Sequence, residues 1–254
     1  MVEALADLSA RDYLSGTSDT VIHIPCRIEP TVFVVKVRGH YRVPEEKGTV
    51  AMKLTTMTQI TVDGVMQGNG GTSDEDRTNG FVRGGWAMGA GDGDTMDYIT
   101  RTYQRAEGFL YGRRTYEMFA SSWGTVDAMR THPIGIALNK APKYLVTSTL
   151  TTPPWQDTTV LSGDLVAAIN ELKAKPGGEL QVHGSRTLIR WLLEHDLVDE
   201  MTLLVVPVVL GQGARLFPDD GLDTALESVH SRTDSKGVSI QVYRPVGRPQ
   251  FATA

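Results

Sequence analysis

Strand-like and helix-like segments alternate along the chain from residue 52 to about residue 244. Short runs rich in Val, Ile, Leu and Thr are followed by segments of helical periodicity. This alternation is typical of an α/β protein, in which helices cover both faces of a mostly parallel sheet. The last two strands, near residues 223–231 and 237–244, are joined by a short turn at Lys236 and Gly237. They predict an antiparallel edge and therefore a mixed sheet.

The predicted strands cover residues 53–62, 108–111, 143–147, 158–161, 179–183 and 200–210. The predicted helices cover residues 94–106 (capped by Asp94 or Thr95), 114–121, 164–174 and 185–194. The strand over residues 200–210 is so apolar that both of its faces must be covered. It therefore marks either the centre of the sheet or a surface through which the chain forms a homodimer.

A third of the segment from Gly64 to Gly93 is glycine, which is ten of the 26 glycines in the chain. Glycine weakens both helices and strands, so we expect a long loop rather than a regular core element. We interpret this glycine-rich segment as a mobile lid over a substrate. Large side chains in or near it either line an apolar pocket for a flat ring or pack the loop on the body: Phe81, Trp86, Met88 and Trp123.

Residues 1–51 differ in character from the rest and include the only cysteine, Cys26. Met52 begins a stretch typical of the start of a domain. We therefore expect an N-terminal extension over residues 1–51 (a genuine one, or the result of a start set too early), a domain over residues 52–246 and a tail over residues 247–254. A single cysteine excludes an intramolecular disulfide, and the N-terminus lacks the pattern of a signal peptide. These features predict a reducing, cytoplasmic location.

The formal net charge of −5 argues against general affinity for nucleic acid. The longest apolar run, residues 203–210, is far shorter than the roughly 18 residues needed to cross a bilayer. The histidines show no metal-ligand spacing, so no metal site is predicted. We therefore expect a small-molecule substrate as the partner, with no nucleic acid and no membrane.

Residues 112–115 have the features of an anion-binding site. A short apolar strand runs into Gly112, Arg113, Arg114 and Thr115, and a helix follows. A helix N-terminus exposes unpaired N–H groups and a partial positive charge, and the two arginines supply fork-shaped donors suited to phosphate. The alternative is that Thr115 only caps the helix and the arginines are solvated.

A second strand-to-helix junction, at residues 183–187, repeats this pattern. His183 and Gly184 end a strand, and the hydroxyl groups of Ser185 and Thr187 lie beside the N-terminal N–H groups of the next helix. Ser185 as a simple N-cap and His183 as a satisfied strand-end residue are the alternatives. Two such junctions in one α/β chain indicate a ligand with several phosphates, such as a dinucleotide.

Other strand ends supply further candidates. Thr147, Ser148 and Thr149 follow a strand, where hydroxyl groups can bind phosphate or ribose at the crevice of a sheet, unless they only form a turn. Asp63 and Asp97 lie in or beside the glycine-rich segment and are candidates to protonate or orient a substrate, although loop and capping aspartates are usually solvated.

Taken together, these motifs resemble the dihydrofolate-reductase-like superfamily. They occur in the order TVDG, GRRTYE, TST and HGSRTLIRWLLEHDLVDEMTLLVVPVVLGQGARLF. The chain is most similar to the reductase domain of the bacterial riboflavin deaminase-reductase (the RibD C-terminal family) and its stand-alone relatives, over roughly residues 52–244. It lacks the zinc signature of the deaminase domain, so the bifunctional protein itself is excluded.

The resemblance implies a three-layer dihydrofolate-reductase-like fold and NADPH as hydride donor. It implies that residues 112–115 surround the cofactor phosphates and that Thr147 and Ser148 lie near the 2′-phosphate of the adenosine. The pyrophosphate is expected at Gly184, Ser185 and Arg186, with His183 and Thr187 beside it. The nicotinamide is expected beside Asp63 and Gly64.

The implied activity is that of an NADPH-dependent reductase acting on a small heterocyclic or carbonyl substrate, as in 5-amino-6-(5-phosphoribosylamino)uracil reductase. One departure matters: dihydrofolate reductases carry a carboxylate on the first helix, and here Asp97 is only loosely placed. Folate is therefore not the expected substrate, and the proton donor is unassigned, with water as one candidate. The alternatives are a protein that binds NADPH without turnover and a flavin- or nucleotide-binding module.

Overall fold

The computed structural model of the protein describes residues 51–217 and 219–252. The chain divides into two compact units, residues 1–47 and residues 48–254, and the described residues belong to the second. The predicted N-terminal extension therefore lies outside the described residues, apart from Ala51. The predicted reductase domain lies inside them, apart from residue 218.

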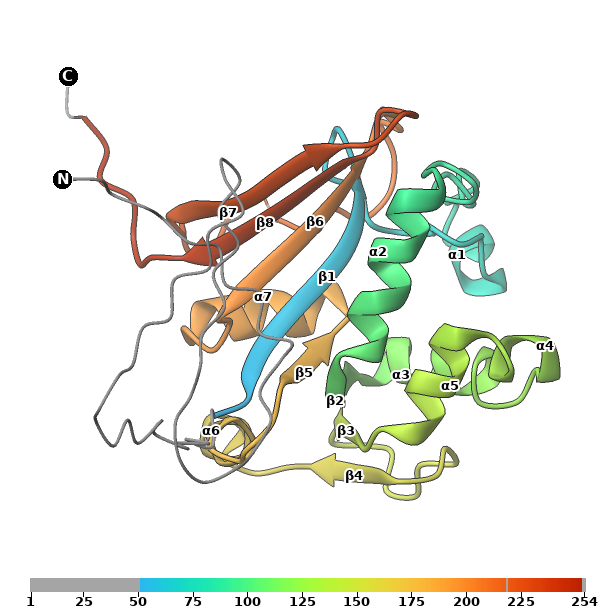
Figure 1. The fold of residues 1–254 in the computed structure, drawn as a ribbon, viewed down its shortest axis with the longest axis vertical. Coiled ribbons are helices and arrows are strands. Elements are labelled where there is room, and N and C mark those ends of the chain that lie inside the picture. Colours follow the sequence, from blue (N-terminus) through green and yellow to red (C-terminus); the bar gives the residue numbers. More distant parts are fainter. Residues whose placement is uncertain (1–50, 218, 253–254) are drawn as a thin grey trace, which may run out of the picture. The chain divides into compact units, whose positions relative to one another are not determined.

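A mixed eight-stranded sheet forms the centre of the described unit, with the order β4-β3-β2-β5-β1-β6-β8-β7 (Figure 1). Pairing is parallel from β4 to β6 and antiparallel between β6, β8 and β7. The predicted mixed sheet with an antiparallel C-terminal edge is confirmed. The strands are β1 (Lys53–Thr61), β2 (Ala106–Gly112), β3 (Lys143–Val146), β4 (Thr158–Leu161), β5 (Glu179–Val182), β6 (Glu200–Val206), β7 (Leu226–Thr233) and β8 (Ser239–Pro245).

Helices cover both faces of this sheet, which gives three layers. One face carries α2 (Gly93–Gln104), α3 (Arg113–Ser122) and α5 (Pro133–Lys140), and the other carries α6 (Leu165–Lys173) and α7 (Arg186–Glu194). The alternation of side chains along β2 supplies both cores, because Phe109 and Tyr111 face α3 while Leu110 faces α7. Two short helices, α1 (Asp74–Thr78) and α4 (Asp127–Arg130), lie in the connections.

The structure corrects three expectations about these elements. The apolar strand β6 ends at Val206 rather than at residue 210, because Pro207 has no N–H to donate to the ladder. The cap of α2 is Asp92, whose side chain accepts from the Thr95 N–H at 3.1 Å, rather than Asp94 or Thr95. Helix α5, which begins at Pro133, was missed. Because β6 lies between β1 and β8, its apolar sequence is explained by a place inside the sheet.

The glycine-rich segment is packed more closely than the predicted loop. Phe81 is buried with Val65 and Leu210. Its ring lies between two glycines, since a Cβ built on Gly68 or Gly213 would come within 2.5 or 2.7 Å of it. Glycine at these two positions therefore allows close packing around an aromatic ring.

Both ends of the glycine-rich segment are tied to the rest of the fold by carboxylates. At its start, Asp63 accepts hydrogen bonds from the main-chain N–H groups of Leu210 (3.1 Å) and Gly211 (2.8 Å). At its end, Asp92 accepts from the main chain and hydroxyl of Ser235, in the turn between β7 and β8. The segment is therefore held at its ends as well as through Phe81.

The four large side chains that the sequence offered as a pocket lining have different surroundings in the structure. Phe81 and Trp86 pack the glycine-rich segment on the body, and the indole N–H of Trp86 donates to the carbonyl of Gln67 at 2.8 Å. Met88 is exposed, and Trp123 packs beside His132 at the end of α3. Phe81 and Trp86 therefore agree with the alternative interpretation, in which these side chains pack the loop on the body.

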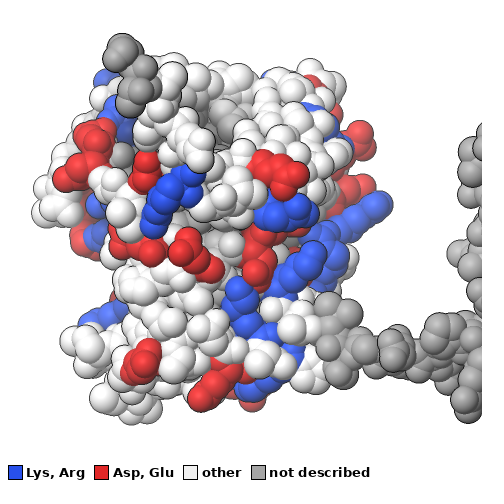
Figure 2. All heavy atoms as spheres, turned by 90° about the vertical axis from the view of Figure 1, so that its left-hand side faces the viewer, with Lys and Arg blue, Asp and Glu red and all other residues white. Residues whose placement is uncertain are grey.

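Charged side chains of both signs are interspersed over the face seen in Figure 2. Within the described ranges, no helix is both long enough and apolar enough to span a bilayer. The described part of the chain also contains no group of three or more His, Cys, Asp or Glu side chains that could hold a metal ion.

Candidate functional site

The strands β2 and β5 are parallel neighbours, but the connections that follow them lead to opposite sides of the sheet. After β2 the chain passes through α3 to β3 on one side, and after β5 it passes through α7 to β6 on the other. Helices α3 and α7 therefore leave from the same edge of the sheet but lie on opposite faces (Figure 1). Such a switch point opens a crevice at the carboxyl ends of the strands, where open α/β sheets bind ligands.

The starts of α3 and α7 pack against each other at this switch point. A Cβ on Gly112, before α3, would lie 2.6 Å from the Ser185 hydroxyl oxygen. A Cβ on Gly184, before α7, would lie 2.8 Å from the Thr115 hydroxyl oxygen. The structure thus brings together the two helix starts that the sequence indicated as anion sites.

The two helix starts differ in how their N–H groups are satisfied. Helix α3 has Gly112 at its N-cap and no side-chain hydrogen bond there, and Thr115 is buried one turn inside. The interpretation of Thr115 as the cap is therefore wrong. Helix α7 is capped by Ser185, whose hydroxyl accepts from the Leu188 N–H at 3.4 Å. The first-turn N–H groups of α3 therefore have no partner on the cap residue's side chain, whereas one of those of α7 does.

Arg113 and Arg114 reach different parts of the molecule. Arg113 donates from Nη1 to the Thr149 hydroxyl (2.5 Å) and from Nε to Glu117 (2.8 Å). Arg114 instead pairs with Glu75 of α1, in the glycine-rich segment. Both guanidinium groups are exposed at the crevice side of α3, so each can exchange its present partner for an anion.

The hydroxyl-rich end of β3 lies beside Arg113. The Thr147 hydroxyl accepts from the main-chain N–H groups of Thr149 and Leu150, both at 3.3 Å, which is the turn that the sequence offered as an alternative. Ser148 is exposed next to it. The turn therefore presents the hydroxyl groups of Ser148 and Thr149 near a guanidinium.

Asp63 has the surroundings of an anchor rather than of a proton donor. Its carboxylate accepts from the Thr61 hydroxyl at 2.6 Å as well as from two main-chain N–H groups. The hydrogen bond from Thr61 is the largest influence, and together these bonds lower the pKa of Asp63 to about 2. The carboxylate is therefore ionised at neutral pH, and its expected role as a proton donor is not supported. Gly64, beside it, adopts a φ of +78°.

Asp97 lies on the exposed side of α2. At about 100° of rotation per residue it points away from the buried Ile99, two positions along the helix. The carboxylate faces solvent, so the structure does not bring Asp97 to the floor of the crevice. Arg186 and Thr187 are likewise exposed, but in the first turn of α7 at the crevice.

His183 lies half-buried at the crevice end of β5, directly before Gly184. Its ring stacks on Tyr103 of α2, with centroids 4.1 Å apart, and its Nε2 bonds the Gln181 side-chain oxygen at 3.1 Å. Burial lowers the pKa of His183 to about 3. The sequence indicated His183 but not Gln181 or Tyr103. The alternation Glu179, Gln181, His183 was a polar stripe along one face of β5 that could have indicated Gln181.

This depressed pKa predicts a loss of stability in acid. Below about pH 6.5 the histidine of the unfolded chain binds a proton that His183 in the folded chain does not, so the free energy of unfolding falls as the pH drops from 6.5 towards 3. The slope is at most about 1.4 kcal/mol per pH unit. Urea unfolding at pH 7 and pH 4.5 should show a smaller decrease in the His183→Gln variant than in the wild type. An equal decrease in both proteins would contradict the prediction.

Two hollows in the described part of the molecule lie away from the crevice. One, of about 310 Å³, lies between the end of α7 and the segment before β7 and is lined by Arg190, Leu193 and Phe217. The other, of about 620 Å³, lies at the amino ends of β1 and β6 beside Lys53 and Glu200. Neither is lined by a residue of the two helix starts.

Comparisons with known proteins agree with this architecture. The family model of the RibD C-terminal domain matches residues 52–240. The uncharacterised protein YyaP of Bacillus subtilis (strain 168) is 27% identical over 189 residues, which cover 72% of this chain and 90% of that protein.

Two solved structures are similar in fold. A protein named for riboflavin biosynthesis from Shewanella sp. PV-4 has a TM-score of 0.59 at 22% identity, covering 77% of this chain and 99% of that chain. A pyrimidine reductase-like protein from Corynebacterium diphtheriae has a TM-score of 0.52 at 13% identity, covering 78% of this chain and 94% of that chain. These similarities support the fold described above.

Proposed function

Because the chain belongs to the RibD C-terminal domain family and has the three-layer dihydrofolate-reductase-like fold, we propose that it is an NADPH-dependent reductase of a small heterocyclic or carbonyl substrate. The observation that carries this proposal is the meeting of two helix starts in one crevice at the switch point between β2 and β5. A ligand with several phosphates and a flat ring matches such a crevice.

The residues present fit NADPH. The open N-terminus of α3 and the first turn of α7, with Ser185, Arg186 and Thr187, would hold the pyrophosphate. Gly112 and Gly184 leave no room for a Cβ, which lets the two helix starts approach each other closely enough to contact one ligand together. Arg113, with the hydroxyl groups at the end of β3, is the group best placed for the 2′-phosphate.

NADPH would supply the hydride, and the protein would supply orientation and a shielded site. We place the nicotinamide beside the end of β1, where Asp63 and Gly64 connect β1 to the glycine-rich segment. The role of Asp63 is to hold this connection in place, because its carboxylate is ionised and fully engaged. With Asp63 in that role, water is the proton source that we propose.

The first test is a titration of the full-length protein with NADPH, followed by the fluorescence of the nicotinamide. We expect saturable binding, and its absence up to millimolar NADPH would refute the proposal. Binding without oxidation of NADPH in the presence of pteridines, pyrimidines and carbonyl compounds would identify the alternative, a cofactor-binding protein without turnover. A yellow purified protein would instead favour a flavin module.

The two arginines should contribute differently to cofactor choice. Arg113→Ala should weaken NADPH binding about ten- to a hundredfold and NADH binding much less, because only NADPH carries the 2′-phosphate. Arg114→Ala should affect both cofactors alike, because Arg114 points to Glu75 instead. Titration of each variant with both cofactors measures this. Arg130→Ala is the surface control, because Arg130 pairs with Asp127 in the short helix α4. Equal losses for NADPH and NADH in Arg113→Ala would contradict the assignment.

A further inference from the structure

The strand β7 has one free edge. It pairs with β8 on one side, and within the described ranges no other strand pairs with it. Figure 1 shows it along an outer border of the sheet. Seven of its eight residues are exposed, including Leu226 (38%) and Val229 (45%). A long exposed edge can pair with another chain, and β7 contains neither the proline nor the lysine that often prevents this.

The pairing with β8 determines which main-chain groups of β7 point outward, away from the sheet. Along an antiparallel pair, residues that exchange hydrogen bonds with the neighbouring strand alternate with residues that do not. The bond from the Asp234 N–H to the Val238 oxygen, at 2.9 Å, sets this alternation at one end of β7. The main-chain groups of Ser231 and Thr233 therefore point outward.

A β-bulge changes the alternation at the other end of β7. The register with β8 shifts between Ser228 and His230, which leaves Val229 as an extra residue. At that end the main chain of Ala225 bonds the segment after β8 at 2.8 and 2.9 Å, so Leu226 and Ser228 point outward. The outward residues thus have even numbers before the bulge and odd numbers after it.

This change of parity lets β7 pair with a second copy of itself about a twofold axis. Outward residues must face outward residues if their N–H and C=O groups are to bond. With the axis at the bulge, Leu226 faces Thr233 of the second copy. Ser228 likewise faces Ser231 of the second copy. Each pair forms twice by symmetry, and a shift of one residue would set outward groups against groups already bonded to β8.

The same register brings opposite charges together. Glu227 faces Arg232 of the second copy, and both side chains lie on one face of the sheet, since their partners in β8, Arg244 and Ile240, are four residues apart. Glu227 already pairs with Arg244 at 3.0 Å, and a carboxylate can accept from both arginines. A shift by two residues would place Glu227 opposite Asp234, a pair of like charges, and the opposite shift would leave Arg232 without a facing acid.

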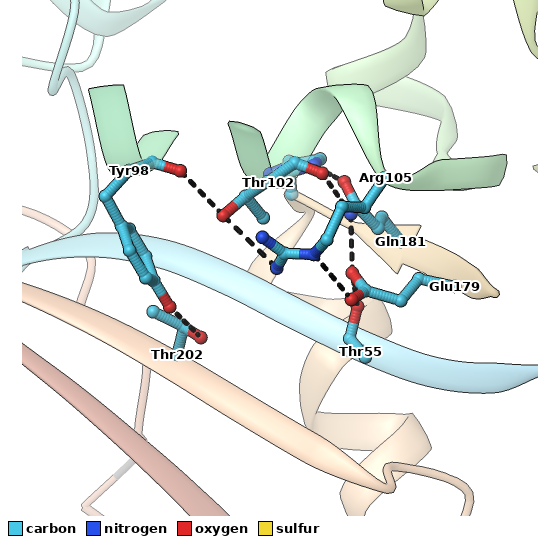
Figure 3. A network of polar contacts seen from close by, with 8 residues as sticks. Thr55, Tyr98, Thr102, Arg105, Glu179, Gln181 and Thr202 are labelled. Atoms are coloured by element: carbon cyan, nitrogen blue, oxygen red, sulfur yellow. Dashed lines mark hydrogen bonds and ion pairs between the residues drawn. The ribbon is translucent and has the colours of Figure 1, made fainter. Parts of the chain in front are cut away.

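Arg232 is held in place for this contact by α2. Its Nη2 donates to the main-chain oxygen of Asp94 at 2.9 Å, and its guanidinium lies 5.4 Å from the centre of the Tyr98 ring. The Tyr98 hydroxyl in turn lies 3.4 Å from the Thr202 hydroxyl of β6 (Figure 3). A guanidinium has five N–H donors, so donors remain for a carboxylate of the second copy.

We propose that the protein forms a symmetric homodimer in which two β7 strands pair antiparallel. The twofold axis lies at the bulge, and an ion pair between Glu227 and Arg232 forms on each side of it. The sheet of one copy then continues into the sheet of the other, and the outward main-chain groups of β7 are satisfied. The dimer does not depend on the proposed reductase function, because neither helix start takes part in it.

Sedimentation velocity of the full-length protein tests the dimer. We expect a dimer at micromolar concentration, and a monomer up to about 0.1 mM would overturn the proposal. Ser231→Pro removes an outward N–H that β8 does not use, so it should give a folded monomer. Ser231→Ala keeps that N–H and is the control that should remain a dimer. A dimer that persists in Ser231→Pro would also overturn the proposal.

Charge reversal tests the register, also if Ser231→Pro does not fold. Glu227→Arg and Arg232→Glu should each weaken self-association about tenfold or more, because like charges then face each other twice. The double variant restores opposite charges and should recover the wild-type association to within about threefold. Arg130→Glu, in α4, is the control and should have no effect. A double variant no better than the single variants would overturn the register.

Cross-linking reads the register directly. In a Cys26→Ser background, Ser228→Cys protein is mixed with Ser231→Cys protein and oxidised with copper phenanthroline. Facing residues of a bonded pair have Cα atoms about 5.5 Å apart, which suits a disulfide, so the mixture should cross-link. Ser228→Cys alone should not, because its two cysteines would lie about 10 Å apart along the strands. Equal cross-linking of Ser228→Cys with itself would contradict the proposed pairing.

Discussion

Replacing Gly184 with alanine should abolish measurable NADPH binding and lower the free energy of unfolding by about 2–4 kcal/mol. Gly184 has a φ of +145°, a conformation that side chains with a Cβ rarely adopt and that costs about 1–3 kcal/mol. The added Cβ would also lie 2.8 Å from the Thr115 hydroxyl and push α7 away from α3. The two helix starts would then no longer face one ligand. Urea unfolding and a fluorescence titration with NADPH measure the two effects.

Gly71 offers a matched control for this substitution. Its φ of +147° is nearly the same, but a Cβ there would meet no atom within 4 Å. Gly71→Ala should therefore show the backbone strain alone and leave NADPH binding intact. The difference between the two variants isolates the contact between Gly184 and Thr115. If both lose the same stability and both bind NADPH normally, the closeness of the two helix starts has no functional role.

Much of the crevice could be predicted because its parts are local in sequence. An apolar strand, a glycine and a helix start are contiguous at residues 108–115 and again at residues 179–187, so each junction was visible by itself. The sequence did not show that the two junctions lie side by side, because β3, β4 and α6 are among the elements that separate β2 from β5 along the chain. The order of strands in a parallel sheet depends on crossover connections, and local periodicity does not encode it. The resemblance to a known family supplied that step.

Residues whose partners are distant in sequence were interpreted less well. From the sequence alone, Asp63 was interpreted as a loop carboxylate. Its main-chain partners, Leu210 and Gly211, lie almost 150 residues away along the chain. Gln181 is an ordinary strand residue in the sequence. Its role becomes clear only in the folded chain, where its side-chain amide donates to the main-chain oxygen of Thr102 in α2. In both cases the side chain acquires its role from contacts that only the folded chain provides.

The glycine-rich segment is a further case in which the sequence did not reveal contacts made in the folded chain. Glycine was interpreted as a sign of mobility, because it relaxes the backbone. In the structure, Gly68 and Gly213 instead make room for the ring of Phe81, and Gly84 crosses the backbone of Gly71 and Thr72 so closely that a Cβ would lie 2.6 Å from it. Composition alone does not separate these two uses of glycine.

The second large effect is expected from Phe81→Ala. Phe81 is 3% exposed and is the centre of the cluster that joins the glycine-rich segment to Val65 and Leu210. Removing a buried phenylalanine ring costs about 3–5 kcal/mol. Because this cluster is small and separate from the two main cores, we expect the loss to appear as local opening of residues 64–93 and not as unfolding of the sheet.

Hydrogen exchange measured by mass spectrometry distinguishes these cases. In Phe81→Ala, peptides from residues 64–93 should exchange at least about a hundredfold faster, while peptides from β1, β5 and β6 keep their protection. Val82→Ala, next in the chain but 68% exposed, is the control and should exchange like the wild type. If residues 64–93 already exchange rapidly in the wild type, the segment is the mobile lid that its glycines suggest. Phe81 then does not hold it on the body, and closure over a substrate has to come from the ligand.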